Sequence, residues 1–314
     1  MALFVLGDLA VKVDAVCPTH GLGLTSLLHE LAFVPAEHAD VPEPAVVLTV
    51  HMHNPAVAVS RGLRHLAERD GLTLYQCGDD TCVGDGSSLL RLCSRTGTGE
   101  AWLTSAFLQQ PRLRRQRFWG YGLTKLLRAR GAYALHAAGV RTPQGQTMLL
   151  IGPSGSGKST LALGLVRHGW GYLSDDAVLL RRRGSRVDAI GFRRAFSVCR
   201  TQRKYRMDVR AAYPQQHIET ASPELLVFPS VARRPRSGMR RVTATDALGR
   251  LLRQGGPELY DRSTMGDHLA LLASLLQQAP AYTLRAGGDL YTRPALLLRV
   301  IRHADGACHG PDRS

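Results

Sequence analysis

Ile151-Gly152-Pro153-Ser154-Gly155-Ser156-Gly157-Lys158-Ser159-Thr160 matches the phosphate-binding pattern G-x-x-x-x-G-K-[ST] at every fixed position. The preceding residues 147–151 are mostly apolar and predict a short buried strand, and residues 161–167 predict the first turns of a helix. Glycines let a backbone wrap closely around an anion, so that successive N–H groups and the helix N-terminus point at phosphate oxygens. We therefore expect residues 152–160 to bind the phosphates of a nucleotide.

Two side chains at the end of this loop indicate which ligands it binds. In loops of this kind the lysine reaches the β- and γ-phosphates, and the hydroxyl of the next residue binds Mg²⁺. These roles fall to Lys158 and Ser159. Only four of the 40 basic residues are lysines, so a lysine at this position runs against the arginine bias of the chain. The alternative is an ordinary Gly/Ser-rich turn before a helix, and the sequence favours ATP and Mg²⁺ binding.

The composition is that of a soluble globular protein, with 44% hydrophobic and 21% charged residues among 314. No apolar run approaches the length of a membrane-spanning helix, and the N-terminal apolar run lacks the basic flank of a signal peptide. The six cysteines are scattered through a chain large enough to fold without disulfides, which favours reduced thiols. We therefore expect a cytoplasmic protein without a membrane partner.

The strand and helix patterns predict two domains and a tail. In residues 1–110, apolar and polar residues alternate loosely between Gly-rich turns, which predicts a smaller β-rich domain. Within it, we expect a short helix over residues 60–70. Residues 111–304 begin with a helical pattern and continue with strands and helices around the loop, which predicts an α/β domain. We expect residues 305–314 to form a frayed tail.

Asp175 and Asp176 follow a short predicted strand that comes directly after the helix of the loop. Two carboxylates at a strand end beside a phosphate loop can bind Mg²⁺ and accept a proton from an acceptor hydroxyl. The alternative is a turn that presents two solvated aspartates. The pair is therefore the first candidate for the catalytic carboxylates.

Most of the net charge of +15 lies just downstream of the loop. Residues 181–241 contain 16 basic and four acidic residues, which gives this segment a net charge of +12. Such a run predicts a surface that binds phosphates or an acidic partner, and a solvated basic face is the alternative. Nucleic-acid binding is the weaker interpretation, because no nucleic-acid motif is present. Four residues of this run are expected to bind the acceptor: Arg200, Arg203, Lys204 and Arg206.

Three segments together resemble the HPr kinase/phosphorylase superfamily, and in particular the HPr-kinase-related proteins that stand apart from the sugar-transport regulators. They are Leu135-His136-Ala137-Ala138-Gly139-Val140, the loop itself and the Asp175-Asp176 pair, and the resemblance extends over residues 112–300. In this family the acidic pair lies one short helix behind the loop, whereas most loop-containing ATPases place their acidic strand far downstream. The resemblance implies a mixed sheet flanked by helices.

The resemblance also implies roles for individual residues. Asp175 would be the base that accepts the proton of the acceptor hydroxyl, Asp176 would lie near the metal, and His136 would support the reacting phosphate. Asp188 would match a metal-side glutamate of the family. The basic segment that follows it would form a flap over the γ-phosphate.

Two departures from the family pattern concern the acceptor. Trp170 stands where the family has a histidine, and Gly191-Phe192-Arg193-Arg194-Ala195-Phe196 replaces a Gly-rich stretch. Phosphorylase activity, and HPr itself as substrate, therefore do not follow from the resemblance. We expect an ATP-dependent kinase that phosphorylates a hydroxyl, first of all Ser or Thr of a protein or peptide, or else a small-molecule alcohol. The alternative is a nucleotide-binding regulatory module with degraded catalysis, and either could be a monomer or a homo-oligomer.

Overall fold

The computed structural model describes residues 1–15, 23–36, 43–52, 63–69, 71–193, 195–200, 203–232, 234–255 and 262–306. The chain divides into two compact units, Met1–Ala132 and Tyr133–Ser314. Helices and mixed sheets are both present, so the expected α/β class is confirmed. None of the helices in the described ranges is both long and apolar enough to cross a membrane.

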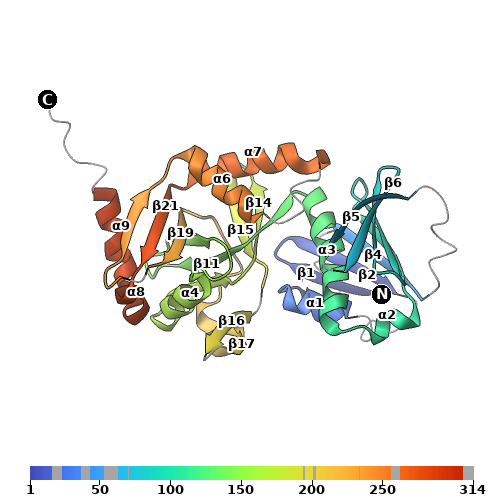
Figure 1. Ribbon diagram of the computed structural model, residues 1–314, viewed down its shortest axis with the longest axis horizontal. Coiled ribbons are helices and arrows are strands. Elements are labelled where there is room, and N and C mark those ends of the chain that lie inside the picture. Colours follow the sequence, from blue (N-terminus) through green and yellow to red (C-terminus); the bar gives the residue numbers. More distant parts are fainter. Residues whose placement is uncertain are drawn as a thin grey trace. The chain divides into compact units, whose positions relative to one another are not determined.

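The first unit, coloured blue to green in Figure 1, is built on a nine-stranded sheet. Its strands follow the order β3-β1-β2-β4-β9-β8-β7-β6-β5. The pairs β2–β4 and β4–β9 are parallel, and the other neighbours are antiparallel. The strands are β1 (Ala2–Leu6), β2 (Leu9–Ala15), β3 (Val34–Pro35), β4 (Val46–His51), β5 (Arg64–Arg69), β6 (Leu72–Cys77), β7 (Asp80–Gly84), β8 (Leu89–Cys93) and β9 (Thr98–Trp102). The helices are α1 (Leu24–Glu30), α2 (Ser105–Gln109) and α3 (Arg112–Ala129).

The long helix α3 packs into the core of the first unit. Phe118 and Trp119 of α3 lie edge-on to Phe107 of α2, with ring centroids 5.0 and 6.3 Å apart. A side chain at Gly122 would collide with Leu90 of β8, so the helix lies directly against the sheet. The sequence pattern places the domain boundary near residue 110, where the helix begins. The structure instead divides the chain after Ala132, because the apolar face of α3 is buried in the first unit.

Strand β5 stands where the sequence pattern predicts a short helix over residues 60–70. It pairs antiparallel with β6, with a shift of register between His65 and Ala67. Isolated helices of this length are marginal in water, so pairing with a neighbouring strand decides the conformation. Residues 60–62 and 70 of that prediction lie outside the described part of the chain.

The second unit contains a six-stranded sheet of order β13-β11-β12-β19-β21-β20, a four-stranded sheet of order β10-β14-β15-β18 and a hairpin of β16 and β17. The strands are β10 (Ala132–Leu135), β11 (Ala137–Arg141), β12 (Thr147–Ile151), β13 (Gly171–Ser174), β14 (Val178–Arg183), β15 (Arg186–Gly191), β16 (Ala195–Arg200), β17 (Arg203–Asp208), β18 (Thr220–Ala221), β19 (Leu225–Val231), β20 (Gly238–Arg241) and β21 (Ala281–Ala286). The helices are α4 (Lys158–Arg167), α5 (Val209–Ala212), α6 (Ala244–Gln254), α7 (Arg262–Gln278), α8 (Gly288–Thr292) and α9 (Leu297–Gly306), with short 3₁₀ turns at Pro214–Gln216 and Pro294–Leu296. Residues 307–314, most of the expected tail, lie outside the described residues.

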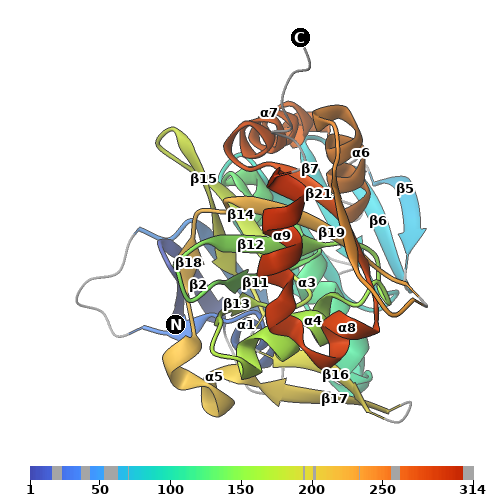
Figure 2. The ribbon, with the colours of Figure 1, turned by 90° about the vertical axis from the view of Figure 1, so that its left-hand side faces the viewer.

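The six-stranded sheet is buried on both faces. Met148 and Leu150 of β12 pack in one core cluster with side chains of α4, α8 and α9. Leu149 and Ile151 belong to the opposite cluster, which includes α6, α7 and the four-stranded sheet. This alternation follows from the two-residue period of a strand. Figure 2 shows α4, α8 and α9 in front of the central strands, and burial on both sides explains why β12 is almost entirely apolar.

The carboxyl ends of four strands lie at the same edge of the six-stranded sheet. β12, β19 and β21 are parallel, and β13 has the direction of β12 because both are antiparallel to β11. The loop follows β12, the Asp175-Asp176 pair follows β13, and Val231 ends β19. Open α/β sheets bind ligands outside the carboxyl ends of their strands. This edge therefore holds the candidate site.

The basic segment after β15 forms the β16–β17 hairpin, in which Arg200 pairs with Arg203. Strand β16 contacts α4, the helix that begins at the end of the loop. The hairpin leads into α5, where the Asp208 carboxylate accepts hydrogen bonds from the N–H groups of Arg210 at 3.0 Å and Ala211 at 3.4 Å. The segment is thus a formed hairpin next to the helix of the loop.

Candidate functional site

The loop of residues 152–157 joins the end of β12 to the first turn of α4. Gly155 and Gly157 have φ angles of 82° and 93°, left-handed conformations that glycine adopts without strain. At Gly157 a side chain is also excluded sterically, because a Cβ atom would collide with the hydroxyl of Tyr291. The strand and the helix predicted on either side of the loop are therefore present, and the backbone between them needs its glycines.

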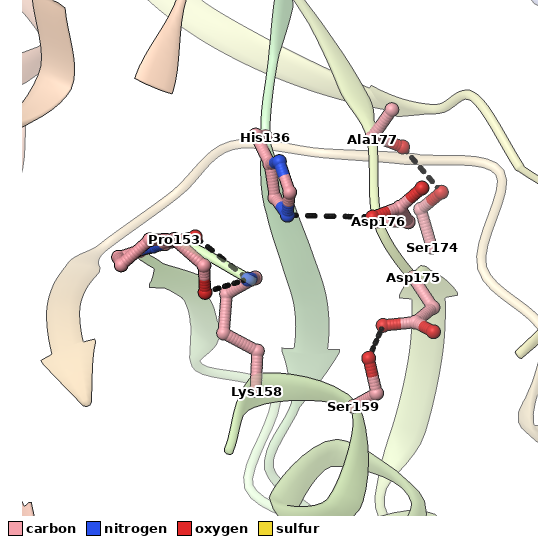
Figure 3. Close-up of polar contacts among 9 residues, drawn as sticks. His136, Pro153, Lys158, Ser159, Ser174, Asp175, Asp176 and Ala177 are labelled. Atoms are coloured by element: carbon pink, nitrogen blue, oxygen red, sulfur yellow. Dashed lines mark hydrogen bonds and ion pairs between the residues drawn. The ribbon is translucent and has the colours of Figure 1, made fainter. Parts of the chain in front are cut away.

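Lys158 is the first residue of α4, directly after the loop, and is only 4% exposed. Its Nζ donates hydrogen bonds to the carbonyl oxygens of Gly152 at 2.6 Å and Pro153 at 3.0 Å (Figure 3). Burial lowers the pKa of Lys158 from its usual value, and Asp176 and Asp175 act in the opposite direction. The ammonium group is thus held inside the loop beside two carboxylates, and its interactions with anions are screened less than they would be in water.

Asp175 is fully buried, and its Oδ1 accepts a hydrogen bond of 2.7 Å from the hydroxyl of Ser159. Ser159 belongs to the first turn of α4, so this bond joins the acidic pair to the loop. Figure 3 shows the two side chains facing each other. Because Asp175 has no surface open to solvent, an external hydroxyl cannot reach it in this conformation.

Asp176 has the opposite environment. Its side chain is 54% exposed, and its Oδ1 lies 3.3 Å from Nε2 of His136 (Figure 3). Its φ angle of 70° is uncommon for a residue other than glycine, and such conformations concentrate at functional sites. Asp176 therefore combines a strained backbone with a carboxylate that a second molecule can reach.

Ser174 fixes the turn that presents this pair. Its hydroxyl donates to the carbonyl oxygen of Ala177 at 2.6 Å and accepts from the N–H groups of Phe192 at 3.1 Å and Arg193 at 2.9 Å. These bonds connect the acidic turn to the segment that leads into the basic hairpin. No motif in the sequence singles out Ser174, although a small hydroxyl residue directly before two aspartates is a recognisable turn signal.

His136 lies between β10 and β11, and its backbone N–H donates to the carbonyl oxygen of Gln254 at 3.0 Å. Burial lowers the pKa of the His136 ring, the cations Lys158 and Arg193 lower it further, and Asp176 opposes them. The ring is therefore mainly neutral at pH 7. In the neutral ring, the distance of 3.3 Å between Nε2 and the Asp176 carboxylate favours the proton on Nε2 rather than on Nδ1.

The pKa of His136 gives a testable dependence of stability on pH. Since the folded state disfavours the protonated ring, the unfolded chain binds more protons below the ordinary histidine pKa of about 6.5. The contribution of His136 to the free energy of unfolding is complete above that pH and falls as the pH drops toward the lower pKa of the folded state. We therefore expect the free energy of unfolding of the wild type minus that of His136→Gln, measured by urea denaturation, to decrease on acidification from pH 7.5 to 5.5. A difference that rises on acidification would contradict the assignment.

Asp188 lies away from this cluster, contrary to its expected metal role. Its Oδ1 accepts a hydrogen bond from the Ser222 hydroxyl, and its Oδ2 is 3.9 Å from Nη1 of Arg183. It stands three residues before Gly191, which pairs with Val178 at the end of the hairpin next to the acidic pair. Three residues of a strand span about 10 Å, so Asp188 lies about that far along β15 from the end of the hairpin next to the acidic pair. Within the described ranges, no group of three or more His, Cys, Asp or Glu side chains is placed to hold a metal ion.

The four basic residues expected to bind the acceptor share the β16–β17 hairpin: Arg200, Arg203, Lys204 and Arg206. The structure describes their backbone and not their side chains, so their role stays a prediction. Trp170, which replaces the histidine of the family, is buried in the core cluster that contains α4.

Comparison with known proteins finds a local sequence match to an HPr kinase/phosphorylase of Chlorobium chlorochromatii (strain CaD3), 52% identical over 40 residues. The match spans 13% of this chain and 12% of the length of that relative, and it confirms the resemblance to the HPr kinase/phosphorylase superfamily. No protein-family model matches the chain. The solved structure of the HPr(Ser) kinase/phosphatase from Coxiella burnetii aligns over 56% of this chain and 99% of its own, with a TM-score of 0.34 and 12% identity.

Proposed function

We propose that the second unit is an ATP-dependent phosphotransferase that moves the γ-phosphoryl group of ATP to a hydroxyl. The observation that supports this most strongly is the convergence of Lys158, Ser159, Asp175, Asp176 and His136 at the loop. It combines a buried cation, a hydroxyl–carboxylate pair and an accessible carboxylate at the carboxyl edge of the sheet. Phosphoryl transfer requires mainly positioning and charge stabilisation, which such a set of groups can supply.

The residues present fit ATP and Mg²⁺. Residues 152–160 would surround the phosphates with backbone N–H groups, and Lys158 would exchange its loop carbonyls for phosphate oxygens. Mg²⁺ prefers oxygen ligands and usually retains some of its waters, and Ser159 and Asp175 offer two oxygens that are 2.7 Å apart. When bound, the ion would neutralise charge on the phosphates.

The proposed base is Asp176, which reverses the roles expected from the sequence. A general base must come within hydrogen-bond reach of the proton that it accepts, and Asp176 is exposed whereas Asp175 is buried against Ser159. The acceptor oxygen would attack the γ-phosphorus while its proton passes to Asp176. The bond between the γ-phosphorus and the bridging oxygen breaks, and ADP leaves with that electron pair. The Nε2–H of His136 would orient the receiving carboxylate.

The acceptor is proposed to be a Ser or Thr hydroxyl of a protein or peptide, or else a small-molecule alcohol. The similarity to an HPr kinase/phosphorylase supports a protein acceptor, and the basic hairpin beside α4 supports one with negative charge. Stimulation of ADP release by an acceptor fraction of the source cells tests this function. ADP release that stays at the background rate with every fraction would exclude it.

The basic hairpin allows a separate test of acceptor binding. Replacing Arg203, Lys204 and Arg206 by Ser should raise the KM for the acceptor and flatten its dependence on salt, because the favourable charge interaction is lost. The affinity for ATP, measured by calorimetry, should change little.

A matched control removes the same charge from the exposed end of the β14–β15 hairpin that is remote from the acidic pair. In this control Arg182, Arg183 and Arg186 are replaced by Ser. The control should leave the KM for the acceptor near the wild-type value. An unchanged acceptor KM in the hairpin variant would indicate a solvated basic face, and a weakened ATP affinity there would assign the hairpin to the nucleotide.

A further inference from the structure

We propose that Tyr291 and Val231 form the nucleoside-binding side of the nucleotide site, a surface that no motif in the sequence indicates. This inference rests on the proposed function, since it requires a nucleotide at the loop. Tyr291 belongs to α8 and Val231 ends β19, far from the loop in sequence.

The sheet places these two residues opposite the acidic pair. The strands lie in the order β13-β11-β12-β19-β21. β13, which precedes the acidic pair, therefore lies on one side of β12. β19, which ends at Val231, and β21, which precedes Tyr291, lie on the other side. Leu150 of β12 is level with Val227 of β19, so β19 continues beside the loop to Val231. A nucleotide whose γ-phosphate faces Asp176 therefore extends its nucleoside toward Val231 and Tyr291.

Both side chains are close to the last glycine of the loop. A Cβ atom built at Gly157 would collide with the Tyr291 hydroxyl and lie 3.2 Å from Cγ2 of Val231. Helix α8 is anchored near its start, because the Asp289 carboxylate accepts from the Ser237 N–H at 3.0 Å and from its hydroxyl at 2.6 Å. The Tyr291 ring thus has a defined position at the end of the phosphate loop.

The Tyr291 hydroxyl is buried and has no hydrogen-bond partner among the residues that the structure describes. Buried hydroxyls in folded proteins almost always have a partner, so a ligand oxygen at this position would satisfy the group. Burial also raises the pKa of Tyr291, which keeps the hydroxyl protonated and able to donate. Val231 is 56% exposed, and a large apolar side chain open to solvent beside this hydroxyl is suited to contact a ribose or a base.

The chemistry therefore indicates a nucleoside with an oxygen acceptor on its ribose. Tyr291 would donate to that oxygen while Val231 packs against the apolar face of the same group. Neither residue is placed to contact the γ-phosphate, because Asp175, Asp176 and Ser159 occupy the other side of the loop. The two residues should then contribute equally to the binding free energies of ATP and ADP.

Calorimetric titration of the protein with unmodified ATP, ADP and inorganic tripolyphosphate, each with Mg²⁺, tests this inference. Tyr291→Phe should weaken ATP and ADP alike by roughly 2- to 10-fold, the range expected for one neutral hydrogen bond. Val231→Ser should also weaken both nucleotides, and tripolyphosphate should bind both variants like the wild type. Without nucleotide, the Tm of Tyr291→Phe should equal or exceed that of the wild type, since an unpaired buried hydroxyl is removed.

Tyr213→Phe is the matched control, because Tyr213 and Tyr291 are both partly buried and pack against the same core cluster. It should leave all three affinities unchanged. Wild-type nucleotide affinity in Tyr291→Phe would overturn the inference, and an equal loss for tripolyphosphate would show that Tyr291 only supports the loop. If the wild-type protein bound neither ATP nor ADP, the proposed function itself would fail.

Discussion

In the Asp176→Asn variant, phosphoryl transfer is expected to fall by roughly 10²- to 10⁴-fold, the usual contribution of a general base. Asparagine keeps the size of the side chain and can still pair with His136, but it cannot accept the proton of the acceptor hydroxyl. ATP affinity should stay near the wild-type value or increase slightly, because a negative charge close to Lys158 is removed. Initial rates of ADP formation with a saturating acceptor fraction, together with ATP titration by calorimetry, measure both effects.

The neighbouring variant Asp175→Asn is the matched comparison. Because Asp175 is joined to Ser159 on the proposed metal side, this variant should need a higher Mg²⁺ concentration for half-maximal rate. Its rate at saturating Mg²⁺ should recover more than that of Asp176→Asn. If Asp176→Asn transferred phosphate at the wild-type rate while Asp175→Asn did not, the assignment made from the sequence would be right and the one made from the geometry wrong.

The second large effect is expected for Lys158→Ala. Removing one partner of a buried, hydrogen-bonded charge pair costs roughly 2–5 kcal/mol in binding, or about 30- to 4,000-fold in affinity. Lys158 is 4% exposed, so solvent would not replace its contacts with a bound phosphate. Calorimetric titration with ATP and Mg²⁺ should therefore show a loss of at least about 30-fold, and turnover should be lost with it.

Arg167→Ala is the control for that loss, because it removes one positive charge from the exposed end of the same helix. It should bind ATP like the wild type. Circular dichroism of Lys158→Ala should retain the wild-type spectrum, which separates lost binding from lost folding. Wild-type affinity and turnover in Lys158→Ala would refute the assignment of residues 152–160 to phosphate binding.

Local patterns predict the fold of the second unit well because they reflect direct physical requirements. A mostly apolar run of five residues directly before a phosphate loop predicts a buried strand, and glycines followed by an apolar helical period predict a loop and a helix. Helix α3 is also predicted from its periodicity, yet its domain is not, because periodicity does not say which core buries the apolar face. The strand β5 is missed for a similar reason, since its conformation depends on pairing with β6.

The candidate site is predicted in composition but not in detail. Asp175 and Asp176 are adjacent in sequence and indistinguishable there, and only the burial of one and the exposure of the other separate their roles. Asp188 has the right residue type but pairs with Ser222 away from the loop. Tyr291 reaches the loop only because β19 lies beside β12 and β21 lies beside β19, and no local pattern encodes that order of strands.

The proposed phosphoryl transfer is tested most directly with ATP radiolabelled on its γ-phosphate, incubated with Mg²⁺ and an extract of the source cells. Label is then followed in the protein fraction and in the small-molecule fraction, for wild type, Asp176→Asn and Lys158→Ala. The account predicts that the wild type transfers label to an acid-stable phosphoester in one of the two fractions and that both variants lose this transfer. It is contradicted if the wild type binds ATP but labels neither fraction above the Lys158→Ala background, which would indicate a nucleotide-binding regulatory module.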